Sequence, residues 1–187
     1  IYRASMFRTA RGVIKETTDM TPMFFICVGD LLGAIHHVST NERESGIKFK
    51  RSSQQEKFNA LKERVFDKVP EGIKERILKI EEKVNALPQE VGRYGICHGD
   101  FHMNNFFVEE NNVWVFDFDG CAYANYLYDV ASFVQACFLH GYGAGKDLRK
   151  LMNEELLHYF KIGYNLNMKC PENFWDDLDL FIAYRTA

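Results

Sequence analysis

The chain has 187 residues, of which 47% are hydrophobic and 26% charged, and its formal net charge is −3 at pH 7. This length and composition are typical of one globular domain with its own core. The slightly acidic balance argues against a general nucleic-acid binder, which is usually basic. No apolar run reaches the length of a membrane span and no signal-peptide pattern is present, so we expect a cytoplasmic protein with neither a membrane nor a nucleic-acid partner.

The five cysteines are scattered along the chain, odd in number and without a Cys-x-x-Cys pair. This usage is typical of reduced thiols in a cytoplasm. We therefore expect neither a disulfide framework nor a structural zinc site.

Helical signals dominate the first half of the chain. The dipeptide Thr21-Pro22 predicts a helix start, with Thr as the N-cap and Pro at the first helical position. The polar stretch 41–52 predicts a loop. A capping-box pattern that begins at Ser53 predicts a second helix, and Pro70 opens a third with apolar residues at helical spacing.

The periodicity changes in the middle of the chain. Residues 94–97 are a strand candidate, and 106–108 and 113–118 predict two strands joined across Glu110-Asn111-Asn112, where asparagine tolerates the positive φ of a tight turn. Further helices are predicted over about 130–138 and 148–160, and from Pro171 onward. The expected fold class is α+β and mostly helical, with a small β-hairpin at its centre.

Three polar residues around this hairpin carry the chemistry. Asp100 and Asn105 lie in His-Gly-Asp-Phe-His-Met-Asn-Asn, and Asp117 follows twelve residues later at the end of an apolar run. Metal-assisted phosphoryl transfer uses one carboxylate to accept the proton of the attacking hydroxyl. It also uses oxygen ligands, such as an amide and a second carboxylate, to hold Mg²⁺ against the nucleotide phosphates.

These residues resemble a known family. The pattern His-Gly-Asp-x-His-x-x-Asn, followed by an apolar strand and Asp-Phe-Asp, is similar to that of aminoglycoside phosphotransferases and choline kinases, small-molecule kinases with a protein-kinase-like fold. The resemblance runs from about Asp30 to the end and is strongest over 97–133. It includes Tyr128-Asp129-Val130-Ala131, which is similar to the family's Tyr-Asp-Leu-Ala segment.

The resemblance implies a role for each residue at its matching position. Asp100 would be the catalytic base, and Asn105 and Asp117 would bind Mg²⁺, with ATP as co-substrate. Phe107 and Phe116 would lie beneath the adenine ring.

Three further residues would support the catalytic loop. By the same resemblance, His98 would brace this loop and Asp129 would tie it down from the following helix. His102 lies within the loop and would either orient Asp100 or Asn105 or contact the substrate.

The chain also departs from the family pattern. A complete kinase of this type has an N-terminal lobe of strands with a nucleotide-covering loop and a phosphate-contacting lysine. Residues 1–97 show neither and are mainly helical by pattern. We therefore expect residues 1–187 to form a single C-terminal-lobe domain that is a fragment of a longer protein and inactive alone.

Two other functions remain open at this point. Asp117 and Asp119 after an apolar strand also resemble the first motif of haloacid-dehalogenase-type phosphatases, in which the first Asp is the nucleophile and the second a general acid. A catalytically silent, kinase-like binding protein is the other alternative. For a kinase, the acceptor hydroxyl could belong to an aminoglycoside, a choline-like amine, an amino acid, a sugar or a protein side chain, and the oligomeric state is open.

Overall fold

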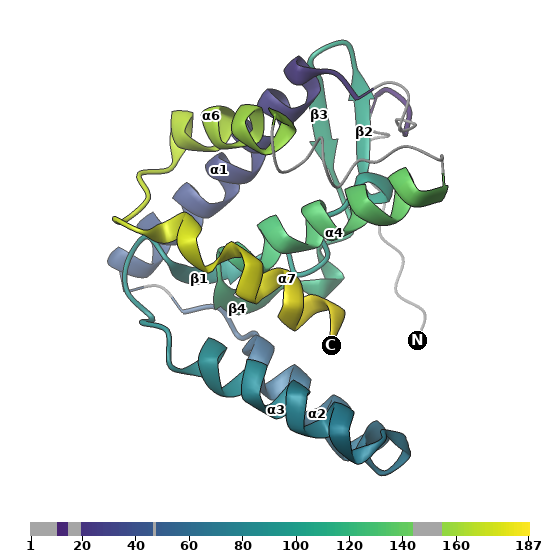
Figure 1. Cartoon of the computed structure of the whole chain (residues 1–187). Helices are drawn as coiled ribbons and strands as arrows, with labels where there is room; N and C mark the ends of the chain where they lie inside the picture. The colour runs from purple at the N-terminus through teal and green to yellow at the C-terminus, as the bar shows by residue number, and fades with distance from the viewer. Residues whose placement is uncertain (1–10, 15–19, 47, 144–154) are drawn as a thin grey trace, which may run out of the picture.

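The computed structural model describes residues 11–14, 20–46, 48–143 and 155–187. Helices form most of this part, and two small pairs of strands lie among them (Figure 1). In chain order the main elements are α1 (Pro22–Glu44), α2 (Gln54–Val65), α3 (Glu71–Asn85), β1 (Tyr94–Cys97), β2 (Phe106–Glu109), β3 (Asn112–Val115), β4 (Ala122–Asn125), α4 (Leu127–Gly143), α6 (Leu157–Asn167) and α7 (Leu178–Thr186). The predicted α+β, mostly helical fold class is confirmed.

Helix α1 begins where its sequence signals predict. The Thr21 hydroxyl accepts the backbone N–H of Phe24 at 3.2 Å, and Pro22 is the first helical residue. The helix continues to Glu44, so the loop predicted to begin at position 41 begins at Ser45 in the structure. α1 packs along α6, and this approach is so close that a Cβ at Gly163 would collide with the carbonyl group of Ile26.

Among the described helices, α1 alone is long and apolar enough to cross a membrane, which corrects the expectation of no such run. Its Phe25, Val28 and Leu32 are fully buried against the rest of the protein. In this structure α1 is therefore a core helix, and its apolar face is covered by protein.

The capping box that opens α2 is confirmed. The backbone N–H of Ser53 donates to the Glu56 carboxylate at 2.6 Å, and the Glu56 N–H donates back to the Ser53 hydroxyl at 3.1 Å. Helices α2 and α3 form an antiparallel pair that extends from one end of the protein (Figure 1). A salt bridge of 2.6 Å between Lys62 and the buried Glu81 joins them.

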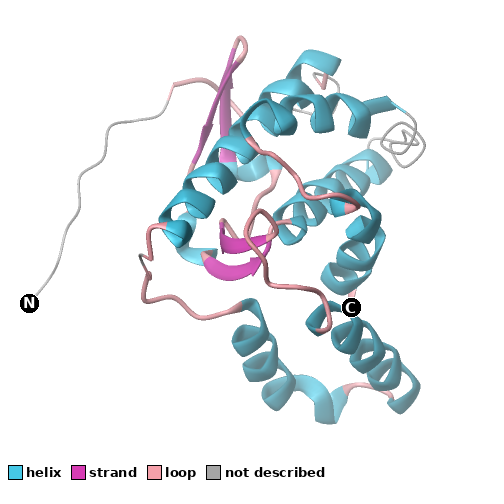
Figure 2. Cartoon of the chain, turned by 90° about the vertical axis from the view of Figure 1, so that its left-hand side faces the viewer, coloured by secondary structure: helices cyan, strands magenta, loops and turns pink. Residues whose placement is uncertain are grey.

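The strands form two separate antiparallel pairs, drawn in magenta in Figure 2. The β2–β3 hairpin was predicted, but its positive φ of 55° is at Glu110 and not at an asparagine. β3 ends at Val115, and a 3-10 turn over 118–120 replaces the predicted end of that strand. The second pair joins β1 to β4, a strand that the sequence patterns did not predict.

The core lies between α1, α4 and α6. Phe133 of α4 stands 5.7 Å from Phe25 of α1 and 5.3 Å from Phe160 of α6, measured between ring centroids. α4 is longer than the helix predicted over 130–138. Of the helix predicted over 148–160, residues 148–154 lie outside the described residues, and α6 includes the last four residues. The last helix, α7, begins at Leu178 rather than near Pro171, after a 3-10 turn over 174–177.

Candidate active site

The segment between β1 and β2, residues 98–105, is the catalytic-loop candidate. It turns at Gly99, whose φ is +85°, a backbone conformation that strains other residues. A Cβ at Gly99 would also collide with the carbonyl group of Gly120. Glycine is therefore what allows this loop to lie directly against the segment that follows Asp117.

A single buried carboxylate holds the start of this loop. Asp129, in the first turn of α4, accepts the backbone N–H of His98 at 2.6 Å and that of Gly99 at 2.8 Å. Asp129 is fully buried, and bonds from N–H groups to an ionised carboxylate are among the stronger hydrogen bonds in proteins. The backbone just before Asp100 is therefore fixed by α4.

Asp129 is in turn braced by His36 of α1. The His36 Nε2 atom lies 3.2 Å from Asp129 Oδ2, and Nδ1 lies 2.7 Å from the Tyr164 hydroxyl. Complete burial lowers the pKa of His36, which favours a neutral ring that donates one N–H to Asp129 and accepts from Tyr164. Sequence patterns gave His36 no part in the site, because its partners lie 93 and 128 residues away.

Asp100 and Asn105 are brought together by the loop. The Asn105 side-chain N–H₂ group donates to the Asp100 carbonyl oxygen at 2.9 Å and lies 3.4 Å from Asp100 Oδ2. This leaves the Asn105 amide oxygen as the atom that can bind a cation. The side chain of Asp100 is 46% exposed, so a substrate hydroxyl can reach it.

His102 contacts the Asp100 carboxylate directly. Its Nδ1 atom accepts the backbone N–H of Asn104 at 3.2 Å, so the ring hydrogen is on Nε2 when the ring is neutral. That Nε2–H points to Asp100 Oδ2 at 3.2 Å. Of the two roles expected for His102, orienting the carboxylate has direct geometric support.

Phe116, the residue before Asp117, is held on both sides. The Phe116 N–H donates to the Asn105 carbonyl oxygen at 3.0 Å, and His98 Nε2–H donates to the Phe116 carbonyl oxygen at 2.9 Å. Through this hydrogen bond the fully buried His98 joins the loop to the segment after β3. Asp117 is the next residue, and its φ of 62° is a left-handed conformation that aspartate and asparagine adopt more often than most other residues do.

The oxygen atoms at this point fit a divalent cation. Asp117 and Asp119 are exposed, and no lysine, arginine or histidine of the described residues pairs with either carboxylate. With the Asn105 amide oxygen nearby, the donor set consists of oxygen atoms only. Mg²⁺ commonly binds through one or two carboxylates and keeps several waters.

A second group of possible metal ligands, His36, Cys97 and Asp129, lies in the core within 4.8 Å of one another. Both ring nitrogens of His36 and both oxygens of Asp129 are already in hydrogen bonds. Burial raises the pKa of Cys97 well above its usual value, which disfavours the thiolate that a metal needs. This cluster therefore fits a structural role.

Phe107 and Phe116 form an apolar pair beside the metal-ligand candidates. Their ring centroids are 4.7 Å apart, and both side chains are partly exposed. Phe107 lies on β2 opposite Trp114 of β3. The rings thus offer an apolar surface on the hairpin, next to the position of Asp117.

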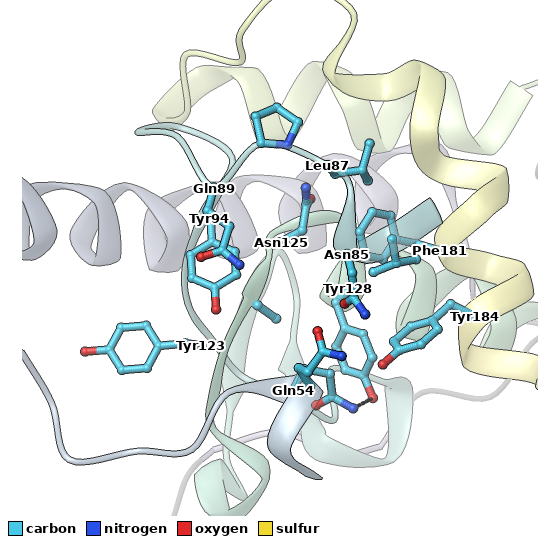
Figure 3. A pocket seen from close by; sticks show the side chains of 14 residues that line it. Gln54, Asn85, Leu87, Gln89, Tyr94, Tyr123, Asn125, Tyr128, Phe181 and Tyr184 are labelled. Carbon is cyan, nitrogen blue, oxygen red and sulfur yellow. Dashed lines mark hydrogen bonds between the residues drawn. The ribbon is translucent and has the colours of Figure 1, made fainter. Parts of the chain in front are cut away.

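Arg185 of α7 completes the surroundings of Asp100. Its Nη2 atom lies 3.8 Å from Asp100 Oδ1, and its Nη1–H donates to the Tyr128 hydroxyl at 2.7 Å. Figure 3 shows Tyr128 in a pocket where Gln54 also donates to its hydroxyl and Tyr184 lies close by. Sequence patterns did not single out Arg185, since nothing local relates it to the catalytic loop.

The fold of the described residues is similar to that of solved small-molecule kinases. A solved amicoumacin kinase, hAmiN in complex with AMP-PNP, Ca²⁺ and Ami, superposes with a TM-score of 0.81 at 19% identity, over 95% of this chain and 53% of that one. A microcompartment-associated aminopropanol kinase gives a TM-score of 0.62 at 18% identity, over 89% of this chain and 52% of that one.

Sequence comparison gives the family. Residues 16–164 match the phosphotransferase enzyme family, and the chain belongs to it. An amicoumacin kinase of Bacillus subtilis (strain 168) is 24% identical over 162 residues, which cover 85% of this chain and 47% of that protein. The chain thus spans about half the length of these relatives.

The alternative interpretation of Asp117 and Asp119 as a haloacid-dehalogenase motif does not fit this fold. That interpretation needs further strands after Asp117 that carry a Thr or Ser and a Lys. In the described residues the chain after Asp117 contains one strand, β4, and then helices. β4 pairs antiparallel with β1, and β3 pairs with β2.

Proposed function

We propose that this chain provides the base and the metal ligands of an ATP-dependent small-molecule kinase. The observation that carries the proposal is the double hydrogen bond on Phe116, which ties the residue before Asp117 to the loop that carries Asp100 and Asn105. The proposed base, amide oxygen and second carboxylate thus lie on two segments that are joined through Phe116. Phosphoryl transfer depends on such positioning and on charge neutralisation more than on covalent chemistry.

In the proposed reaction the hydroxyl group of the substrate donates a hydrogen bond to the Asp100 carboxylate. The hydroxyl oxygen attacks the γ-phosphorus of ATP as its proton moves to the Asp100 carboxylate. The bond from the γ-phosphorus to the bridging oxygen breaks, and ADP leaves with that electron pair. His102 N–H keeps the carboxylate oriented during this step, because its hydrogen bond fixes one of the two oxygens.

The remaining residues hold the nucleotide. Asn105 and Asp117 would bind Mg²⁺, which supplies charge neutralisation on the phosphate oxygens when it is bound. Phe107 and Phe116 would support the adenine ring through apolar contact. Asp129 and His98 act on the reaction through the backbone, because they fix where Asp100 and Asp117 lie.

The acceptor is proposed to be a small hydroxylated molecule, in line with the amicoumacin and aminopropanol named for its relatives. We further propose that these residues form the C-terminal lobe of a cytoplasmic enzyme. Before α1, the described residues add only a bridge between Val13 and β2. A nucleotide-covering wall would then come from another part of the enzyme, and the 187 residues alone should turn over ATP weakly.

Replacing the base tests the proposal. In the complete polypeptide that carries this chain, Asp100→Asn should lower acceptor-dependent ADP release by about 10²–10⁴-fold, the usual contribution of a general base. Nucleotide affinity should stay nearly unchanged, because Asp100 is not among the proposed metal ligands. The exposed Asp67→Asn, on the 3-10 turn after α2, is the matched control.

Two results would contradict this function. Unchanged ADP release in Asp100→Asn would remove Asp100 as the base. Nucleotide binding without ADP release across a broad panel of hydroxylated metabolites and antibiotics would favour the catalytically silent alternative.

A further inference from the structure

A small cavity opens beside Asp100, between the catalytic loop, α4 and α7. Its volume is about 220 Å³, and His102, Ser132, Gln135 and Arg185 are among the residues that line it. Two of these, His102 and Arg185, are also the side chains that approach the Asp100 carboxylate, at 3.2 and 3.8 Å. A group bound here would therefore lie next to the reacting hydroxyl.

Arg185 has hydrogen-bond donors that the described residues do not use. The distance of 3.8 Å from Nη2 to Asp100 Oδ1 is too long for a hydrogen bond, and Nε is buried without a partner among the described residues. Nη1 alone is well bonded, to Tyr128, whose ring also lies 4.9 Å from the guanidinium carbon. Arg185 is thus held in place while part of its planar fork stays available.

A second unused donor lies in the same cavity wall. Ser132 of α4 is only 2% exposed, and its hydroxyl has no hydrogen-bond partner among the described residues. Unpaired buried polar groups are uncommon in native proteins, and a missing ligand is one reason for them. Two unpaired donors in one wall point to a ligand with oxygen acceptors.

The charge of the cavity wall narrows the ligand further. No aspartate or glutamate is among the described residues that line it, and Arg185 adds a positive charge. The Asp100 carboxylate beside the cavity already faces His102 and Arg185, whereas a bound carboxylate would match the geometry of the guanidinium fork. The family match ends at residue 164, so Arg185 lies outside the part of the chain that the family match covers.

We propose that the acceptor is a hydroxy acid, whose carboxylate binds Arg185 and Ser132 while its hydroxyl faces Asp100. This inference rests on the proposed phosphotransferase function and adds the class of acceptor. At about 220 Å³ the cavity is smaller than typical ligand pockets of about 300–1,000 Å³, so it fits the carboxylate end of a small molecule.

Binding of matched pairs to the 187-residue chain tests the proposal without nucleotide. The pairs are threonine with 1-aminopropan-2-ol, homoserine with 3-aminopropan-1-ol, and glycerate with glycerol, and ligand-observed NMR gives the affinities. In at least one pair the acid should bind about tenfold or more tightly than its partner, which corresponds to one charge-assisted hydrogen bond.

The variants assign that preference to the cavity. Arg185→Gln should bring the affinity for the acid down to that for the matched alcohol, and Ser132→Ala should weaken it by about twofold to tenfold. Arg76→Gln, an exposed arginine on α3, should leave the preference intact. Circular dichroism verifies that each variant is folded.

The outcomes separate this proposal from the proposed function. If no acid binds more tightly than its partner, or if Arg185→Gln keeps the preference, the hydroxy-acid assignment is wrong. ATP turnover with amine acceptors alone would uphold phosphotransfer and overturn this inference. Arg185-dependent acid binding with no turnover in the complete polypeptide would support a carboxylate site at Arg185 and overturn the proposed function.

Discussion

Replacing Asp129 by asparagine should destabilise the whole domain, although Asp129 contacts no substrate. Asp129 Oδ2 receives both the His98 N–H and the His36 ring N–H, and Oδ1 receives the Gly99 N–H. The asparagine oxygen is best placed where two donors meet, so its N–H₂ group would face the Gly99 N–H. One hydrogen bond to a charged group is lost, and two buried donors, the Gly99 N–H and the asparagine N–H₂, face each other without an acceptor.

The magnitude follows from these contacts. A hydrogen bond to a charged group contributes about 1.5–3 kcal/mol, and an unsatisfied buried group costs about 1–3 kcal/mol, so we expect the free energy of unfolding to fall by at least about 2.5 kcal/mol. Urea unfolding followed by circular dichroism measures this change. The exposed Asp67→Asn removes the same charge and should stay within about 0.5 kcal/mol of the wild type.

The reasoning would be refuted if Asp129→Asn were no less stable than Asp67→Asn. Such a result would mean that the loop finds other acceptors for its N–H groups. If stability falls as expected, acceptor-dependent turnover in the complete polypeptide should fall as well, because the backbone of Asp100 follows directly on these two bonds.

Two more predictions concern the same region. Burial lowers the pKa of His36 below 6.5 in the folded protein, so protonation of its ring favours the unfolded chain. The stability that the neutral His36 ring contributes is therefore complete above about pH 6.5, and it is lost as the pH falls toward the folded-state pKa. Unfolding measured across this range should show a shallower acid dependence in His36→Gln, and an unchanged dependence would exclude His36 as a cause. Gly99→Ala should lower the free energy of unfolding by about 1–2 kcal/mol from the strain of the left-handed backbone alone. The collision of the new Cβ with Gly120 should lower it further and abolish turnover. Wild-type activity in this variant would show that the loop turn tolerates a side chain.

Local signals in the sequence predicted the parts of the fold that depend on near neighbours. The Thr21 cap and the Ser53 capping box each act within three residues, and both occur as expected. The β2–β3 hairpin is also local. Its turn was less well predicted, since the positive φ is at Glu110, where tertiary and strand geometry outweigh the residue preference.

The missed features depend on distant partners. β4 has the sequence Ala-Tyr-Ala-Asn, which shows little strand preference, and it forms because β1 offers a partner edge. His36 and Arg185 belong to helices whose patterns predict only amphipathic packing. Their contacts with Asp129 and Asp100 arise from how α1 and α7 pack, which no spacing along the chain encodes.

The hydrogen bonds from Tyr164 through His36 to Asp129 also bear on when the site forms during folding. They join residues 128 and 93 positions apart, so they close only after α1, α4 and α6 have packed together. Contacts over such separations form late because they require large loops to close. The backbone amides of His98 and Gly99 should therefore exchange with solvent only through global unfolding, and loss of core packing anywhere in these helices should be detected as loss of the catalytic geometry.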